Sequence, residues 1–298
     1  MVERSCVLLG DRAVLEVAGP DRRAFLQGLV SNDIDKVTPD RAVYAALLTA
    51  QGKYLHDFFI TEMGDAFYLD AEAARLADLK RRLGLYRLRA KVTLGENGDR
   101  YIVAAAFGGD ALSLLDLPPE PGAVAPVADG IAYVDPRLPE LGARLLLPRG
   151  ERLAPLESAG FRAEGADAYD RLRLSLGIPD GSRDLPVEKA ILLESGFEEL
   201  NGVDWQKGCY IGQELTARTK YRALIKKRLM PVTVEGPLPA PGTPVMLGDR
   251  EAGEMRSGRD GLGLALLRLD VLDGAPGGEP LVAGAARLTP RKPGWANF

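Results

Sequence analysis

The first hundred residues alternate between strand-type and helix-type patterns in an order that few folds can accommodate. Apolar residues alternate with polar ones in the strand segments and recur at helical spacing in the helix segments. The order of segments is strand, helix, strand, strand, helix, strand. It predicts a β-α-β-β-α-β unit whose helices pack on one face of an antiparallel sheet. The expected segments are, in order, Val7–Val17, Arg22–Val30, Tyr44–Thr49, Tyr54–Thr61, Ala71–Leu83 and Leu88–Leu94.

A second, fainter copy of this unit follows, although no residue pattern repeats with it. Strand patterns and helix patterns alternate again, and an amphipathic helix closes the series. We expect strands at Tyr101–Phe107, Gly130–Val134 and Ala143–Leu147, and helices at Ala111–Leu115, Glu151–Ala159 and Ala166–Leu176.

The last 68 residues differ in amino-acid composition from the rest of the chain, because 12 of the 34 glycines and 9 of the 21 prolines fall there. Short strand patterns between such turn residues are typical of a small β-barrel or sandwich. We therefore expect an α+β protein with two ferredoxin-like β-α-β-β-α-β units and a C-terminal β-barrel. The expected domains are 1–100, 101–229, which carries the cysteine motif described below, and 230–298. The barrel strands are expected at Pro231–Val234, Pro244–Leu247, Gly263–Leu269 and Ala285–Leu288.

Histidine and cysteine are too scarce for several kinds of site. With one histidine, His56, and two cysteines, Cys6 and Cys209, the chain cannot supply four ligands to a structural zinc ion or to an all-cysteine iron–sulfur cluster. The common phosphate-binding glycine loops are missing as well. The net charge of −4 argues against a general nucleic-acid binder. We expect no resident metal site and no nucleic acid as direct ligand.

The sequence shows neither a secretory signal nor a membrane-spanning segment. The first ten residues contain Glu3 and Arg4 and lack a long apolar core. Apolar runs such as Ile102–Phe107 are far shorter than the ~18 residues that a span needs. Two cysteines are also too few for a disulfide framework. These features predict a cytoplasmic protein without membrane contact.

The segment Lys207–Arg218, with the sequence KGCYIGQELTAR, is the most unusual in the chain. Two glycines flank Cys209 and Tyr210 and allow a sharp turn, and a helix is expected from Gln213 onward. The helix dipole and the cation of Lys207 would both favour a thiolate at Cys209. Cys209 is therefore a candidate reactive thiol, and an inert cysteine in a loop is the alternative.

The neighbouring candidates have simpler interpretations. Glu214 and Arg218 are four residues apart and share a helix face. Cys6 falls in a predicted core strand, and His56 falls in an apolar strand, so both are expected to be structural. A thiol hydrolase built from Cys209 and His56 stays open, and it requires the two side chains within hydrogen-bond reach.

The K-G-C-Y-x-G-Q-E run at 207–214 resembles the signature of the YgfZ-type family, folate-binding relatives of the glycine cleavage T protein (aminomethyltransferase). The resemblance covers nearly the whole chain and implies a three-part ring around a central cavity that accepts tetrahydrofolate, with or without a polyglutamate tail. Family members support the maturation or upkeep of iron–sulfur enzymes, and the motif cysteine matters to that role. Weaker matches are FLQGLVSND at 25–33, QGK at 51–53, LRAKV at 88–92 and GEMRS at 253–257.

The resemblance implies a set of functional residues, and two positions depart from the aminomethyltransferases. His56 stands where those enzymes carry the first of two adjacent carboxylates, and Ser175 stands where they carry the glutamate that holds the pterin. A conventional aminomethyltransferase is therefore not expected, whereas folate binding is. The candidate catalytic residues are Cys209 and Lys207, and the candidate folate contacts are Asn32, Gln51, Lys53, Asp57, Tyr210, Gln213, Glu214 and Arg218.

The function expected from these residues is that of a tetrahydrofolate-binding accessory protein for the assembly or repair of iron–sulfur proteins. It would act through Cys209, touch a cluster transiently, and meet iron–sulfur client or assembly proteins. The alternative is a folate-dependent one-carbon transferase in which Asp57 or Cys209 replaces the missing carboxylate. A basic run at 220–228 is interpreted as a solvated face, or as a contact for a polyanion such as a polyglutamate tail or an RNA.

Overall fold

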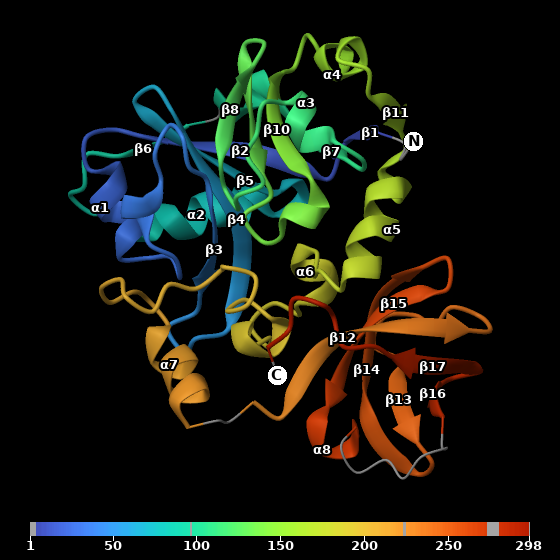
Figure 1. Cartoon of the computed structure of the whole chain (residues 1–298). Coiled ribbons are helices and arrows are strands. Elements are labelled where there is room, and N and C mark those ends of the chain that lie inside the picture. Colours follow the sequence, from blue (N-terminus) through green and yellow to red (C-terminus); the bar gives the residue numbers. More distant parts are fainter. Residues whose placement is uncertain (1–3, 96, 223–224, 273–279, 298) are drawn as a thin grey trace. The chain divides into compact units, whose positions relative to one another are not determined.

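The computed structural model describes residues 4–95, 97–222, 225–272 and 280–297 (Figure 1). The chain divides into two compact units, each assembled from separate stretches of sequence. Unit 1 comprises Met1–Leu48, Leu55–Tyr169 and Leu200–Ile211. Unit 2 comprises Thr49–Tyr54, Asp170–Glu199 and Gly212–Phe298.

The first sheet of unit 1 contains a strand that the sequence patterns did not predict. This strand, β5, pairs along its whole length with β2 and also with β4, so it separates them in the sheet order β3-β4-β5-β2-β6. The helix expected from Ala71 therefore begins at Leu76, and the ferredoxin-like unit is not confirmed. The elements are β2 (Arg12–Ala18), α1 (Arg22–Gln27), β3 (Val43–Leu48), β4 (Tyr54–Met63), β5 (Ala66–Glu72), α2 (Leu76–Tyr86) and β6 (Thr93–Gly95).

The second sheet of unit 1 has the order β11-β1-β7-β10-β9-β8. Strand β1, which lies within residues 1–100, pairs antiparallel with β7 and parallel with β11. Apolar side chains such as Cys6, Leu145 and Phe161 form its core. The elements are β1 (Ser5–Leu8), β7 (Tyr101–Phe107), α3 (Ala111–Leu114), β8 (Val124–Val127), β9 (Gly130–Val134), β10 (Ala143–Pro148), α4 (Ala154–Ser158) and β11 (Arg162–Glu164).

Unit 2 contains a closed barrel with the order β12-β15-β14-β13-β16-β17, which confirms the predicted C-terminal barrel. Its core holds Val232, Val245, Met255 and Leu267. The barrel elements are β12 (Lys227–Glu235), β13 (Pro244–Leu247), β14 (Arg250–Arg259), β15 (Leu262–Arg268), α8 (Leu269–Leu272), β16 (Leu281–Ala283) and β17 (Ala286–Pro290).

Three further α-helices and the short 3₁₀ helix Leu192–Ser195 lie in residues 166–221. Helix α5 (Ala166–Leu176) has the predicted bounds, α6 (Gly181–Asp184) follows it, and α7 (Gln213–Tyr221) begins at Gln213 as the motif predicts. None of the helices in the described ranges has the length and apolar character needed to cross a bilayer. The mixed α+β class is confirmed, while the ring around a central cavity stays a prediction.

Candidate functional site

The predicted reactive cysteine lies on a segment of unit 1 without regular secondary structure, residues 200–211, here called the Cys209 loop. Ser31, just after α1, attaches this loop to the first sheet. Its hydroxyl donates to the carbonyl oxygen of Gly202 at 2.6 Å and accepts from the backbone nitrogen of Ala46 at 2.8 Å. At the far end of the loop, the backbone nitrogen of Ile211 donates to the carbonyl oxygen of Gly28 at 3.2 Å. Both ends of the loop are therefore bonded to the region around α1.

Lys207 attaches the Cys209 loop to the rest of unit 1 through three hydrogen bonds. Its Nζ donates to the carbonyl oxygens of Gln27 at 2.8 Å, Val30 at 2.6 Å and Asn32 at 2.7 Å. An ammonium group has three donors, so all of them are used. Burial lowers the pKa of Lys207 to about 8, and its Nζ lies 5.1 Å from the ring centre of Tyr210. The geometry makes Lys207 a positioning residue, and a direct effect on the Cys209 thiol stays a prediction.

Asp204 shapes the backbone just before Lys207. Its Oδ1 accepts from the backbone nitrogens of Gln206 at 2.7 Å and Lys207 at 3.0 Å, and its Oδ2 pairs with Lys36. Burial alone would raise the pKa of Asp204, but the hydrogen bonds and the Lys36 cation lower it overall. A charged aspartate here therefore turns the loop so that Lys207 enters the protein.

Cys209 is exposed, whereas Cys6 is buried in the second sheet. Burial raises the pKa of the Cys6 thiol to about 11, so Cys6 stays protonated at neutral pH. The sharp turn expected between two glycines is made by Gly212 alone, whose φ is +82° at the start of α7. Cys209 belongs to unit 1 and α7 to unit 2, so the influence of the helix dipole on this thiol stays a prediction.

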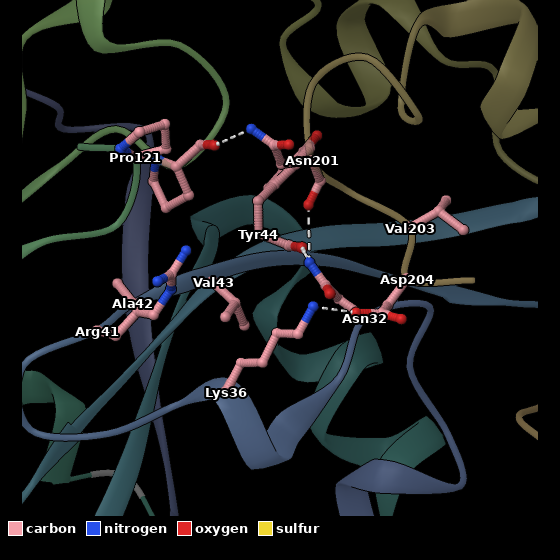
Figure 2. Close-up of a pocket in the computed structure, with 11 residues that line it drawn as sticks. Asn32, Lys36, Arg41, Ala42, Val43, Tyr44, Pro121, Asn201, Val203 and Asp204 are labelled. Carbon is pink, nitrogen blue, oxygen red and sulfur yellow. Dashed lines mark hydrogen bonds and ion pairs between the residues drawn. The ribbon is translucent and has the colours of Figure 1, made fainter. Parts of the chain in front are cut away.

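A small pocket of about 200 Å³ lies beside the Cys209 loop in unit 1 (Figure 2). Asn32 is directed between two backbones there, and its Nδ2 donates to the carbonyl oxygens of Tyr44 and Asn201, both at 2.7 Å. Lys36 is paired with Asp204, which lines the same pocket, so the added positive charge comes from Arg41. The volume is below the ~300–1,000 Å³ of typical small-molecule pockets, so the pocket can hold one group of a ligand rather than a whole folate.

The predicted folate contacts fall into both units. Asn32, Asp57 and Tyr210 lie in unit 1, while Gln51, Lys53, Gln213, Glu214 and Arg218 lie in unit 2. Several are bonded within the chain: Tyr44 donates to Asp57 at 2.9 Å, and Glu214 pairs with Arg218 across one helix turn, as the spacing predicts. Lys53 differs, because the described residues offer its ammonium neither a hydrogen bond nor an ion pair. Of these side chains, Lys53 is therefore a suitable contact for an anionic ligand.

His56 is structural, as its pattern predicts. Its Nε2 lies 3.0 Å from Oδ2 of Asp78 on α2, and its side chain is 3% exposed. Burial and the cation of Arg75 lower the pKa of His56 to about 4, so the ring is neutral at pH 7. Within the described ranges no hydrogen bond joins His56 to Cys209, so the contact that a thiol hydrolase requires is missing.

A buried group of charges in unit 1 was missed by the sequence reasoning. Asp70 on β5 bonds Arg12 at 2.7 Å and Arg144 at 2.5 Å, and Asp135 bonds Arg137 at 2.8 Å. Burial alone would raise the pKa of Asp70, but the two arginines lower it overall. The sequence did contain a signal for this group, because Asp70 stands among apolar residues in AFYLDAE. An aspartate buried in a core requires a cationic partner.

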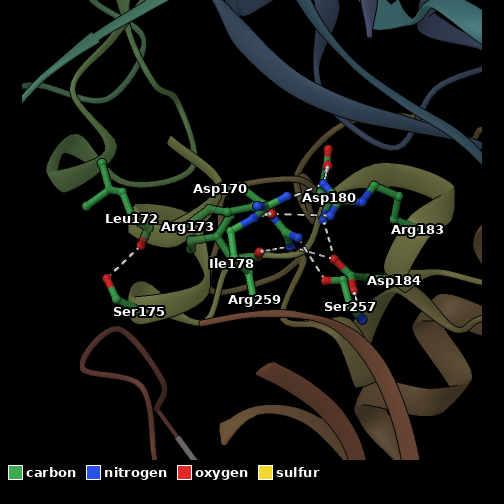
Figure 3. A network of polar contacts seen from close by, with 10 residues as sticks. All are labelled: Asp170, Leu172, Arg173, Ser175, Ile178, Asp180, Arg183, Asp184, Ser257 and Arg259. Atoms are coloured by element: carbon green, nitrogen blue, oxygen red, sulfur yellow. Dashed lines mark hydrogen bonds and ion pairs between the residues drawn. The ribbon is translucent and has the colours of Figure 1, made fainter. Parts of the chain in front are cut away.

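The second departure from the aminomethyltransferases, Ser175, uses its side chain within its own helix. Its hydroxyl donates to the carbonyl oxygen of Leu172 on α5 at 2.7 Å (Figure 3). Arg173, on the same helix, is the centre of a network of polar contacts. Its guanidinium group donates to Asp170 at 2.7 Å, Asp184 at 2.7 Å and Ser257 at 2.8 Å. These bonds join α5, α6 and β14 within unit 2.

Two family models match the chain. The GCVT N-terminal domain matches residues 11–117, and the CAF17 C-terminal beta-barrel domain matches residues 226–298. A crystal structure of the glycine cleavage system aminomethyltransferase T from Bartonella henselae superposes with a TM-score of 0.74. It is 17% identical and covers 97% of this chain and 84% of its own, so it supports a shared fold alone.

Similar relatives include the iron-sulfur cluster assembly factor IBA57, mitochondrial, from Mus musculus and from Homo sapiens. Both are 36% identical, over 296 and 290 residues respectively, and each alignment covers 91% of this chain and 79% of the relative. A homologue from Pyricularia oryzae is 32% identical and covers 92% of this chain and 75% of its own. The GCVT family model and the aminomethyltransferase structure confirm the likeness to the aminomethyltransferase-related group, whereas these relatives are named for IBA57 rather than YgfZ. Their names also contradict the cytoplasmic location predicted from the sequence, because all three are mitochondrial proteins.

Proposed function

The chain belongs to the family of the iron-sulfur cluster assembly factor IBA57, and on this premise we propose that it assembles or repairs iron–sulfur proteins through the thiol of Cys209. The observation that carries the proposal is the position of that thiol. Cys209 is exposed, two residues after a lysine whose ammonium is bonded to three backbone carbonyls. The loop thus presents one thiol on a well-anchored segment, accessible to iron–sulfur client or assembly proteins.

One thiolate supplies one ligand, so an iron–sulfur cluster at Cys209 needs ligands from elsewhere. Across residues 4–95, 97–222, 225–272 and 280–297, no group of three or more His, Cys, Asp or Glu side chains could hold a metal ion. The cluster is therefore cargo shared with a partner protein, or the thiolate attacks a disulfide of that partner, so that a mixed disulfide forms as the partner's S–S bond breaks and its second sulfur leaves as a thiolate. In both cases Cys209 must be deprotonated and accessible.

Replacement of each cysteine in turn tests this role. In cells that lack the endogenous gene, Cys209→Ser should abolish the recovery of iron–sulfur enzyme activity, while the melting temperature of the purified protein stays within about 2 °C of wild type. Cys6→Ala is the matched control, because Cys6 is buried and protonated. Retained activity in Cys209→Ser, or equal loss in both variants, would show that the thiol is not the working group.

We further propose that the protein binds a reduced folate, tetrahydrofolate with or without its polyglutamate tail. Two features support this proposal: the KGCY motif, and the ammonium of Lys53, to which the described residues offer neither a hydrogen bond nor an ion pair. Calorimetric titration with tetrahydrofolate should show saturable binding to wild type and to Cys209→Ala alike. Absence of binding in both would reject the folate proposal and leave the role of Cys209 to its own test.

The alternative of a one-carbon transferase is disfavoured by the side chain at position 56. His56 is neutral at pH 7 and bonded to Asp78, so it cannot replace the negative charge of the carboxylate that the transferases carry there. Asp57, the remaining carboxylate, accepts a hydrogen bond from Tyr44. Turnover of an aminomethyl or methylene donor by the purified protein would reverse this preference.

A further inference from the structure

A second cavity, of about 460 Å³, lies entirely within unit 2. It is lined by the turn before β4, by the segment that runs from α6 to the short 3₁₀ helix Leu192–Ser195, and by strands β12, β14 and β15. Its volume falls within the ~300–1,000 Å³ of pockets that hold small molecules. No residue of the Cys209 loop lines it.

Three lysines in this cavity carry charges that the chain does not neutralise by contact. Lys53, Lys189 and Lys227 all line it, and the described residues offer none of their side-chain ammonium groups a hydrogen bond or an ion pair. They come from three separate segments, the turn, the 186–195 stretch and β12. Like charges held around one cavity repel each other, so an anion between them would be stabilised.

The remaining charged groups of the lining contribute little opposing charge. Asp184 is bonded to Arg173 at 2.7 Å, and Glu254 is paired with Arg256. Glu194 is the one lining carboxylate left without a hydrogen bond in the described part of the chain. Three lysine charges less one carboxylate leave an excess of two positive charges in the cavity.

Glu194 is itself poorly solvated. Burial raises the pKa of Glu194, although Lys227, Lys53 and Arg228 act in the opposite direction. Its carboxylate therefore interacts electrostatically with two of the three lysines without forming an ion pair with them. An anionic ligand would compete with Glu194 for these cations. Removal of the Glu194 charge should therefore increase the affinity for the ligand.

The wall of the cavity formed by α6 and β14 is held by the network in Figure 3. Oδ2 of Asp184 accepts from Arg173 and from the backbone nitrogen of Asp180, and Oδ1 accepts from the backbone nitrogen of Ser257 at 2.9 Å. Every bond runs between residues of unit 2. This wall of the cavity is thus held in place by hydrogen bonds and an ion pair.

We propose that this cavity binds a small dianion, whose carboxylate or phosphate groups are held by Lys53, Lys189 and Lys227. The proposal does not involve the Cys209 thiol; it shares Lys53 with the candidate folate contacts, whereas Lys189 and Lys227 lie outside that set. The dianionic charge matches the excess of two positive charges, and lysine ammonium groups bind both carboxylate and phosphate oxygens. The site is therefore selective for charge, and the two anion classes are separated by experiment.

Calorimetric titration of the full chain at low ionic strength tests the site with two probes, inorganic phosphate and γ-glutamylglutamate, which carries a net charge of about −2 at neutral pH. Saturable binding of either probe with one site per chain is expected. Binding of phosphate alone would identify a phosphate ligand, and binding of the dipeptide alone a carboxylate ligand. No binding of either probe at 10-millimolar order, roughly −2.7 kcal/mol by the affinity relation, would overturn the proposal.

Variants decide whether the lysines hold the anion. Lys53→Met and Lys227→Met should each weaken binding about tenfold, or about 1.4 kcal/mol. Glu194→Gln should tighten binding, because it removes the one competing carboxylate; mere loss of structure would weaken it. Lys226→Met is the matched control, since Lys226 is an exposed neighbour outside the cavity lining, and should bind as wild type does. Equal affinity in all four variants would overturn the proposal.

Discussion

Replacing Lys207 by methionine should release the Cys209 loop from α1. Methionine keeps an apolar stem of similar length but offers no donor, so the carbonyl oxygens of Gln27, Val30 and Asn32 lose their shared ammonium. Each buried carbonyl left without a partner costs ~1–3 kcal/mol, which amounts to about 6 kcal/mol for the set. The depressed pKa of Lys207, about 8, corresponds to about 3 kcal/mol that is recovered when the buried ammonium is removed. The net loss of unfolding free energy is therefore about 3 kcal/mol.

Urea unfolding followed by far-ultraviolet circular dichroism measures this loss, and chymotrypsin cleavage after Tyr210 measures opening of the loop. Lys207→Met should unfold at lower urea and be cleaved faster, because Tyr210 is buried beside the Lys207 ammonium. Lys226→Met is the control, since an exposed side chain without such bonds should change stability by less than ~0.5 kcal/mol. If Lys207→Met matches this control in both assays, the three hydrogen bonds do not hold the loop and the reasoning fails.

Three further predictions follow from buried and exposed groups. An aromatic disulfide reagent at neutral pH should titrate Cys209 rapidly and Cys6 only after unfolding, because burial raises the pKa of the Cys6 thiol to about 11; two fast thiols would contradict this. Burial lowers the pKa of His56 from its ordinary 6.5 to about 4, so the unfolded state takes up a proton between these values that the native state does not. Wild-type stability should therefore fall by up to about 3 kcal/mol as pH drops from 6.5 to 4, and urea midpoints of His56→Gln should lack this slope. Asp70→Asn should lower the unfolding free energy by about 3–5 kcal/mol, because it leaves buried arginines without their carboxylate partner. Asp110→Asn is the control, since Asp110 belongs to an exposed ion pair, and it should leave the urea midpoint almost unchanged. Equal shifts of the urea midpoint in both variants would contradict the prediction.

The sequence patterns located elements whose periodicity is strong within a single segment. Helix α5 and strands β9 and β13 have the predicted bounds, since their apolar spacing matches one face of a helix or strand. Strand β5 was missed because Ala71 and Glu72, at its end, favour helix in isolation. Its pairing with β2 over seven residues outweighs that local preference. Of the strand expected at Leu88–Leu94, only Thr93 and Leu94 pair, as part of β6, and Leu88 is 89% exposed at a φ of +41°.

The site divides in a similar way between local and distant information. The motif alone singled out Cys209, placed α7 at Gln213, and paired Glu214 with Arg218, because each depends on residues within one or two helical turns. The scarcity of histidine and cysteine likewise excluded a structural zinc site of four Cys or His ligands and an all-cysteine iron–sulfur site within the chain.

Only the tertiary structure decided what the charged side chains do. The carbonyls that bind Lys207 lie 175 to 180 residues away in the chain, and the arginines on Asp70 lie 58 and 74 residues away. Lys53, Lys189 and Lys227 likewise share a cavity that no local pattern foretells. A short-range pattern reports helix, strand and turn preferences, because these arise between near neighbours. Burial and ion pairing depend on which distant segments fold together, so the role of each charge was determined by the fold.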